Sequence, residues 1–157
     1  MPIINSIHLA RVLDSRGNLT VEASVQTQGG GFGRAIAPSG ASTGEYEAIE
    51  LLASDAIAAA KEYALPMLEG KIDSTDQKSV DSALRSADGT ENFSVIGANS
   101  AVAISLANAK AAANFLDLPL YQHIGFSSKW DSFPIPLGNV IGGGVHAEGS
   151  TYIQEFL

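Results

Sequence analysis

Apolar and polar side chains alternate strictly along residues 19–26. The apolar set is Leu19, Val21, Ala23 and Val25, and the polar set is Thr20, Glu22, Ser24 and Gln26. A period of two places successive side chains on opposite faces, which predicts a half-buried strand. Turn-forming residues flank it, DSRGN (residues 14–18) before and QGGG (residues 28–31) after. The first forty residues are therefore predicted to form an antiparallel meander over residues 3–13, 19–27 and 32–37.

Past Glu45 the pattern becomes helical. Ser54 is a candidate N-cap for a helix over DAIAAAKEYAL, which we expect to end ahead of Pro66, because the residue before a proline disfavours helix. Ser74 and Gln77 have the spacing of a capping box and predict a second helix.

That second helix is predicted to stop at Asp88 and Gly89. A third, alanine-rich helix is predicted from about Asn99 to Phe115, and its small side chains would let neighbouring backbones approach closely. Strands followed by helices are typical of an α+β domain with helices on one face of the sheet. Residues 134–157 differ, since they predict a short strand, a glycine loop and a further strand.

Composition narrows the class of protein. A chain of 157 residues, 45% hydrophobic and 17% charged, suffices for one ordinary core. The net charge of -8, without a concentration of Lys and Arg, excludes a nucleic-acid footprint. The N-terminus lacks the features of a secretory signal, and polar residues interrupt the uncharged residues 92–109 too often for a membrane span. Together with the absence of Cys, these features predict a cytoplasmic protein.

Two loops carry candidate chemistry. Residues 39–44 hold nothing larger than Thr, so their backbone can lie on a ligand while Ser39, Ser42 and Thr43 offer hydroxyls to a cation or phosphate. GGGVHAEG (residues 142–149) presents His146 and Glu148. The alternatives are a solvent-exposed turn and a solvated histidine, and we expect His8 and His123 to be structural.

In the final predicted strand, Gln154 and Glu155 are adjacent, so a regular strand would point their side chains to opposite faces. Glu155 is a candidate for acid/base work, with a surface charge as the alternative. Spacing alone fixes no second carboxylate beside it. The residues themselves thus predict only part of an active site.

These segments together resemble the enolase family. The resemblance rests on DSRGN, PSGASTGEYEA (residues 38–48), DGTEN (88–92), GANS (97–100), LPLYQHIG (118–125), GGGVHAEG and QEF (154–156), in that order. It implies an N-terminal capping domain over residues 1–127, namely a β-meander followed by a helical bundle, and the beginning of a C-terminal α/β barrel over residues 128–157.

The resemblance also implies the chemistry of phosphopyruvate hydratase, a Mg²⁺-dependent lyase of glycolysis that interconverts 2-phosphoglycerate and phosphoenolpyruvate. It implies that Ser42 ligates Mg²⁺ when residues 39–44 close over substrate. Substrate contacts are implied for the following residues: Ser39, Gly40, Ala41, His146, Gln154 and Glu155. Glu155 and His146 are implied to be catalytic, with Glu155 assisting the acid step, whereas the principal acid, the lysine base and three metal carboxylates belong to later barrel strands.

The implied partners are the small phosphorylated substrate, the C-terminal barrel and, when complete, a second copy of the protein. Ala10 stands where the family has the Arg that supports its dimer contact, whereas Glu22 matches the family's interface glutamate. A truncated or split enzyme that is inactive alone is the first hypothesis. The second is a free-standing, non-catalytic capping domain that acts as a binding module.

Overall fold

The computed structural model describes residues 2–40, 44–125, 133–144 and 149–157. Its chain divides into two compact units, Met1–Phe126 and Ser127–Leu157. Within the described residues, no helix combines the length and the apolar character needed to cross a membrane.

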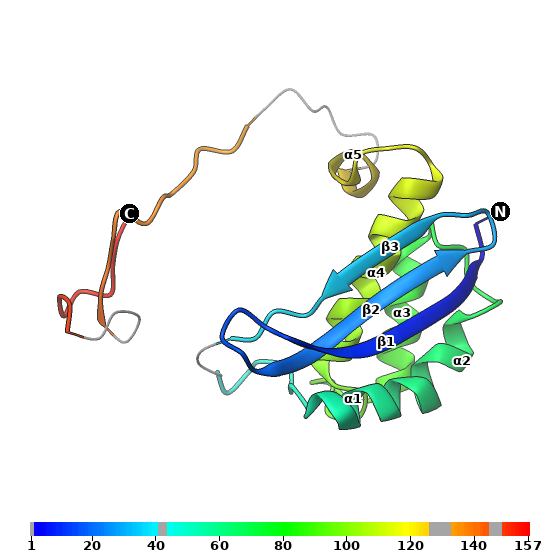
Figure 1. Cartoon of the computed structure of the whole chain (residues 1–157), viewed down its shortest axis with the longest axis horizontal. Coiled ribbons are helices and arrows are strands. Elements are labelled where there is room, and N and C mark those ends of the chain that lie inside the picture. The colour runs from blue at the N-terminus through cyan, green and yellow to red at the C-terminus, as the bar shows by residue number, and fades with distance from the viewer. Residues whose placement is uncertain (1, 41–43, 126–132, 145–148) are drawn as a thin grey trace. The chain divides into compact units, whose positions relative to one another are not determined.

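The first unit opens with a three-stranded antiparallel sheet in the order β1-β2-β3 (Figure 1). The strands are β1 (Ile4–Leu13), β2 (Leu19–Thr27) and β3 (Phe32–Ile36). The predicted meander is confirmed, with differences only at its ends. Ile3 forms an isolated bridge with Asp73, and Ala37, just past β3, donates its N–H to the Val21 carbonyl oxygen at 2.9 Å.

The alternating pattern along β2 correctly predicted that Val21, Ala23 and Val25 lie in the core, where each is 0% exposed. The predicted burial is wrong at the beginning of the strand. Leu19 is 58% exposed, whereas Thr20 is fully buried and its hydroxyl donates to the Ala37 carbonyl oxygen at 2.9 Å. A hydrogen-bonded threonine can replace an apolar residue because its polar atom is satisfied internally.

The helix predicted to end ahead of Pro66 continues past it. It is made of α1 (Ala53–Ala59), a π-helical turn (Ala60–Ala64) and α2 (Leu65–Leu68), and Leu52 rather than Ser54 is the N-cap. The wider turn restarts the helix at Leu65, so Pro66 falls in a first turn, where its missing N–H is tolerated. Sequence spacing cannot reveal such an inserted turn.

The second predicted helix is α3 (Gln77–Asp88), and it ends as expected at Gly89, which has a φ of +70°. Its N-cap is Asp76 rather than Ser74, because the Asp76 carboxylate accepts hydrogen bonds from the Ser79 N–H at 3.2 Å and hydroxyl at 2.6 Å. Ser74 is fully buried, and its Oγ has no partner among the described residues.

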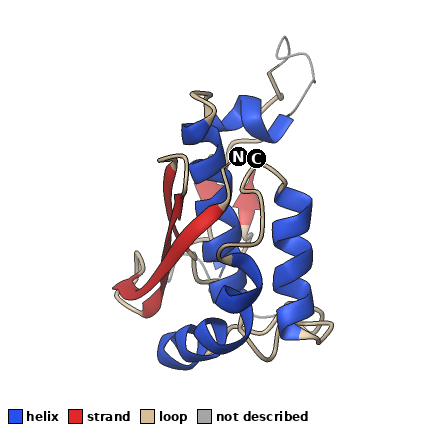
Figure 2. Cartoon of the chain, turned by 90° about the vertical axis from the view of Figure 1, so that its right-hand side faces the viewer, coloured by secondary structure: helices blue, strands red, loops and turns tan. Residues whose placement is uncertain are grey.

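The central helix is α4 (Ala98–Phe115), within one residue of its predicted beginning. Helices cover one face of the sheet, and α4 packs directly on β2 and β3 (Figure 2). The approach is close, since a Cβ on Gly33 would overlap the Ala107 carbonyl oxygen and the Ala111 nitrogen. Small residues therefore set the distance between helix and sheet, as the alanine-rich pattern predicted.

A short helix that the sequence pattern did not predict, α5 (Leu120–Gly125), follows α4. In the second unit, β4 (Ile141–Gly142) pairs antiparallel with β5 (Glu155–Phe156). The two predicted strands are thus present as a short antiparallel pair, and residues 145–148 of the glycine loop between them lie outside the described residues.

Candidate functional site

The DSRGN segment forms a tight turn organised by one carboxylate. Asp14 Oδ1 accepts hydrogen bonds from the backbone N–H groups of Arg16 and Asn18, both at 2.8 Å. The Asn18 N–H is the main reason why the pKa of Asp14 lies below its usual value; Arg16 N–H and the side chains of Ser39 and Asn18 add to it, while desolvation opposes it. The turn thus holds an ionised group beside Ser39.

Ser39 opens the small-residue loop, and its hydroxyl donates to Glu50 Oε1 at 3.2 Å. Gly40 follows it, whereas Ala41, Ser42 and Thr43 lie outside the described residues. On the far side of the loop, the Glu47 N–H donates to the Gly44 carbonyl oxygen at 3.2 Å, which forms a turn. The two ends of the loop are therefore structured.

The DGTEN and GANS motifs build the beginning of α4. The Asp88 carboxylate accepts hydrogen bonds from the N–H groups of Val95 at 2.9 Å and Ile96 at 2.8 Å, and also from Thr90. Desolvation is the largest influence on the pKa of Asp88 and raises it, but these hydrogen bonds together outweigh it and leave the pKa lowered. Both motifs therefore have a structural role at the beginning of α4 in the first unit.

In the second unit, the glycine loop and the QEF segment lie in one ribbon. Gly142 pairs with Glu155, and the Gly143 N–H donates to the Gln154 carbonyl oxygen at 2.7 Å. A Cβ on Gly143 would overlap the Ile153 carbonyl oxygen, so the two segments touch through their backbones. Glu155 is exposed, and His146 lies outside the described residues.

The structure thus brings two sets of predicted residues together, one in each unit. Ser39 and Gly40 lie beside the DSRGN turn, and Gln154 and Glu155 lie against the glycines that precede His146. Glu50 was missed, because its position eleven residues after Ser39 follows no motif or helical period. Of the two histidines expected to be structural, His123 is buried and His8 is exposed.

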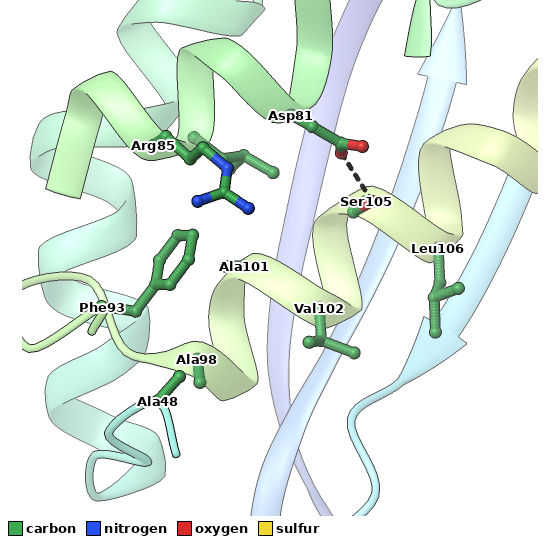
Figure 3. A pocket seen from close by; sticks show the side chains of 10 residues that line it. Ala48, Asp81, Arg85, Phe93, Ala98, Ala101, Val102, Ser105 and Leu106 are labelled. Atoms are coloured by element: carbon green, nitrogen blue, oxygen red, sulfur yellow. Dashed lines mark hydrogen bonds between the residues drawn. The ribbon is translucent and has the colours of Figure 1, made fainter. Parts of the chain in front are cut away.

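A cavity of about 330 Å³ lies elsewhere, between α3 and α4 (Figure 3). The Arg85 guanidinium lies 5.8 Å from the Phe93 ring centroid, and the Ser105 hydroxyl donates to Asp81 Oδ1 at 2.7 Å. The other lining residues are Ala48, Leu84, Ala98, Ala101, Val102 and Leu106. Because it contains no predicted site residue, the cavity does not define the candidate site.

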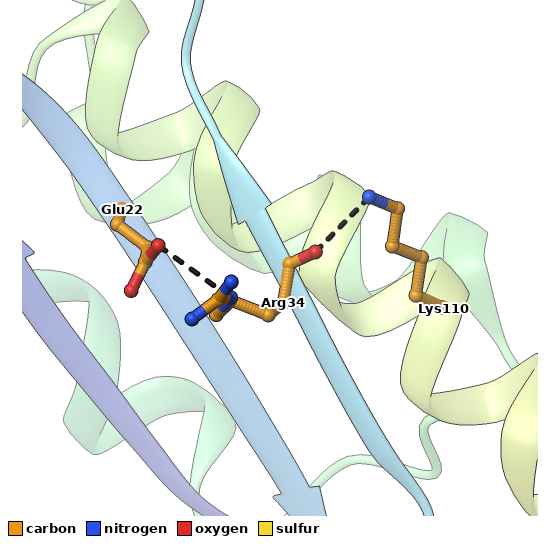
Figure 4. Close-up of polar contacts among 3 residues, drawn as sticks. All are labelled: Glu22, Arg34 and Lys110. Atoms are coloured by element: carbon orange, nitrogen blue, oxygen red, sulfur yellow. Dashed lines mark hydrogen bonds and ion pairs between the residues drawn. The ribbon is translucent and has the colours of Figure 1, made fainter. Parts of the chain in front are cut away.

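Glu22, the residue matched to a family interface, makes an ion pair on the sheet. Its Oε2 lies 3.6 Å from Arg34 Nε on the neighbouring strand β3 (Figure 4). Glu22 faces the apolar Ala10 across the β1–β2 pair. The cation that pairs with the Glu22 carboxylate is Arg34.

A family model described as "Enolase, N-terminal domain" matches residues 4–124. The whole chain is 66% identical to the enolase of Halorubrum lacusprofundi, 62% identical to that of Natronomonas pharaonis and 55% identical to that of Methanocorpusculum labreanum. It spans 39% of the length of each of these relatives. The matched residues include the sheet, all of α1 to α4 and the loop that begins at Ser39, and the chain belongs to the enolase N-terminal domain family.

Proposed function

We propose that this chain supplies the substrate-contact loops of an enolase, a hydro-lyase that dehydrates 2-phospho-D-glycerate to phosphoenolpyruvate. The observation that carries the proposal is 66% identity over all 157 residues to an enolase, loops included. Because the chain spans 39% of that relative's length, we propose that the remaining length provides the barrel, the base and the principal acid. On this proposal the chain is inactive alone.

The reaction explains why such loops are needed. Removing a proton beside a carboxylate produces a doubly negative enolate, and this intermediate becomes accessible only when positive charge neutralises it and water is excluded. In our proposal, residues 39–44 form a lid in which Ser39, Gly40 and Ala41 contact the substrate. A loop of small residues suits this role because its backbone can approach a ligand closely.

The second unit would act on the departing hydroxyl. We assign Gln154 and Glu155 to that part of the pocket, with Glu155 assisting protonation of the leaving group and His146 approaching the substrate from its loop. The backbone contact between Gly143 and Gln154 supports this grouping, because it keeps the glycine loop beside the QEF segment.

We propose only one magnesium ligand in this chain, Ser42. Among the described residues no group of three or more His, Asp or Glu side chains could hold a metal ion, so the described part does not fit a complete magnesium site. Serine oxygen is a suitable ligand for a hard cation. We propose that Ser42 contributes one oxygen to a Mg²⁺ ion whose carboxylates lie in the remaining length of the enzyme.

Further parts of the proposal concern organisation. Residues 1–127 would form the capping domain and residues 128–157 the beginning of the barrel, in a cytoplasmic glycolytic enzyme that is a homo-oligomer when complete. Arg34 already pairs with Glu22 inside the chain. Use of Glu22 in a dimer contact would therefore require sharing or replacing that ion pair.

The test compares two proteins. The chain alone should show no turnover of 2-phosphoglycerate with Mg²⁺, whereas a chimera that joins it to the unmatched portion of the Halorubrum lacusprofundi enolase should be active. In the chimera, Ser42→Ala should lower kcat with a smaller change in KM. Turnover by the isolated chain would refute the division of labour, and a folded but inactive chimera would favour a non-catalytic binding module.

A further inference from the structure

The chain enters the small-residue loop from a fixed point on the sheet. The Ala37 N–H donates to the Val21 carbonyl oxygen and the Thr20 hydroxyl donates to the Ala37 carbonyl oxygen, both at 2.9 Å. Ala37 is 1% exposed and Thr20 is 0% exposed, so water does not compete for these bonds. Ser39 is therefore only two residues from a rigid anchor.

The chain leaves the loop along a second fixed segment. The Ile49 N–H donates to the Asn92 carbonyl oxygen at 2.7 Å, and the Ile49 carbonyl oxygen accepts from the Ala98 N–H at 2.8 Å. The Leu51 carbonyl oxygen accepts from Asn99 Nδ2 at 2.9 Å. Glu50 thus lies between two residues that are both tied to the beginning of α4.

One hydroxyl joins these two segments. The Ser39 hydroxyl donates to Glu50 Oε1 at 3.2 Å, and it also contributes a side-chain hydrogen bond that lowers the pKa of Asp14. Because a hydroxyl has a single proton, the two carboxylates share one donor. The Ser39–Glu50 hydrogen bond therefore links the segment that enters the loop to the segment that follows it.

We propose that Glu50 is a positioning residue that holds the Ser39 hydroxyl, so that the segment entering the substrate loop is bridged to the segment that follows it before any ligand arrives. This inference rests on the proposed function and refines the role of Ser39. A substrate with phosphate and carboxylate groups is repelled by the carboxylate of Glu50, so Ser39 serves the substrate through its backbone while its side chain is an anchor.

The bridge holds the Ser39 backbone in place before a ligand binds. A ligand that contacts this backbone then loses less entropy on binding. A single hydrogen bond of this kind is worth about 0.5–1.5 kcal/mol, or roughly a two- to twelvefold change in affinity. The effect should appear in substrate binding more than in the chemical step.

The first test uses the chain itself and NMR spectroscopy. Ser39→Ala should raise the pKa of Asp14 toward its usual value, and both Ser39→Ala and Glu50→Ala should shift the Gly40 amide resonance. Glu50→Gln, which keeps an acceptor oxygen, should restore most of the Gly40 signal. Glu91→Ala is the control, because Glu91 is exposed and makes no hydrogen bond among the described residues. An unchanged Gly40 amide in Ser39→Ala and Glu50→Ala would overturn the inference.

The second test uses the active chimera. Ser39→Ala and Glu50→Ala should each raise the KM for 2-phosphoglycerate about two- to twelvefold with a smaller change in kcat, and the double variant should resemble either single variant. Fully additive effects would show that Ser39 and Glu50 act independently, against the inference. If the chimera lacks activity the proposed function fails, while the NMR experiment still decides whether the anchor exists.

Discussion

Lys110 Nζ donates a hydrogen bond to the Arg34 carbonyl oxygen at 3.0 Å, from helix α4 to strand β3 (Figure 4). One turn further along, Asn114 Oδ1 accepts from the Phe32 N–H at 2.9 Å. Since β3 is an edge strand of the three-stranded sheet, these two side chains satisfy backbone groups that have no strand partner in the described part of the chain. Such groups otherwise invite pairing with another chain.

Removing these contacts should weaken the edge. Lys110→Met keeps the aliphatic stem but loses the donor, and we expect it to lower the free energy of unfolding by about 0.5–1.5 kcal/mol in urea denaturation. Adding Asn114→Ala should increase self-association, measured by analytical ultracentrifugation. Lys61→Met is the matched control, because Lys61 is an exposed lysine on another helix. Equal effects of Lys110→Met and Lys61→Met would contradict the role of Lys110.

Gly33 sets how closely β3 approaches α4. Gly33→Ala would place a methyl group onto the backbone of Ala107 and Ala111, which side-chain rotation cannot relieve. We expect a loss of about 3 kcal/mol or more in the free energy of unfolding, measured by urea denaturation followed by circular dichroism. Gly138→Ala is the control, since a Cβ at Gly138 meets no atom within 4 Å. Wild-type stability of Gly33→Ala would show that the two elements are not so tightly packed.

Asp88 should make stability depend on pH. Its pKa is lowered in the folded chain, so its contribution is fully present above the unfolded pKa, near 4, and is lost as the pH falls through the folded value. Asp88→Asn should cost about 1–3 kcal/mol at neutral pH, because the amide keeps only one acceptor oxygen.

The measurement is the urea midpoint from pH 7 down to pH 3 for the wild type, Asp88→Asn and Glu91→Gln. The difference between wild type and Asp88→Asn should shrink as the solution becomes more acidic, whereas Glu91→Gln should follow the wild type. A difference that stays constant with pH would mean that the charge of Asp88 does not contribute.

The beginning of α3 offers a test between two candidate caps. Asp76→Ala removes the carboxylate that accepts from Ser79 and should lower the thermal midpoint, whereas Ser74→Ala removes a buried hydroxyl without a described partner and should leave it unchanged or raise it. Thermal unfolding followed by circular dichroism distinguishes the two. The opposite order would restore Ser74 as the cap.

The candidate site was only partly predictable. The residues of the two loops were found from their small or polar composition and from the family resemblance, and the structure describes Ser39, Gly40, Gln154 and Glu155 of that set. The sequence did not predict the role of Glu50, because its hydrogen bond to Ser39 depends on how two chain segments meet in space. Spacing along the chain does not reveal such a contact.

The sequence by itself determined that Val21, Ala23 and Val25 would be buried and that an alanine-rich helix would allow close packing. It also determined where the Asp and Gly turns fall and which family the loops resemble, because these depend on periods and residue types within short windows. Only the tertiary structure decided that Thr20 is buried in place of Leu19, that Pro66 lies inside a continuing helix, and that Ser39 meets Glu50. Each of these outcomes depends on a contact or a register set by distant residues. Local patterns do not encode that information.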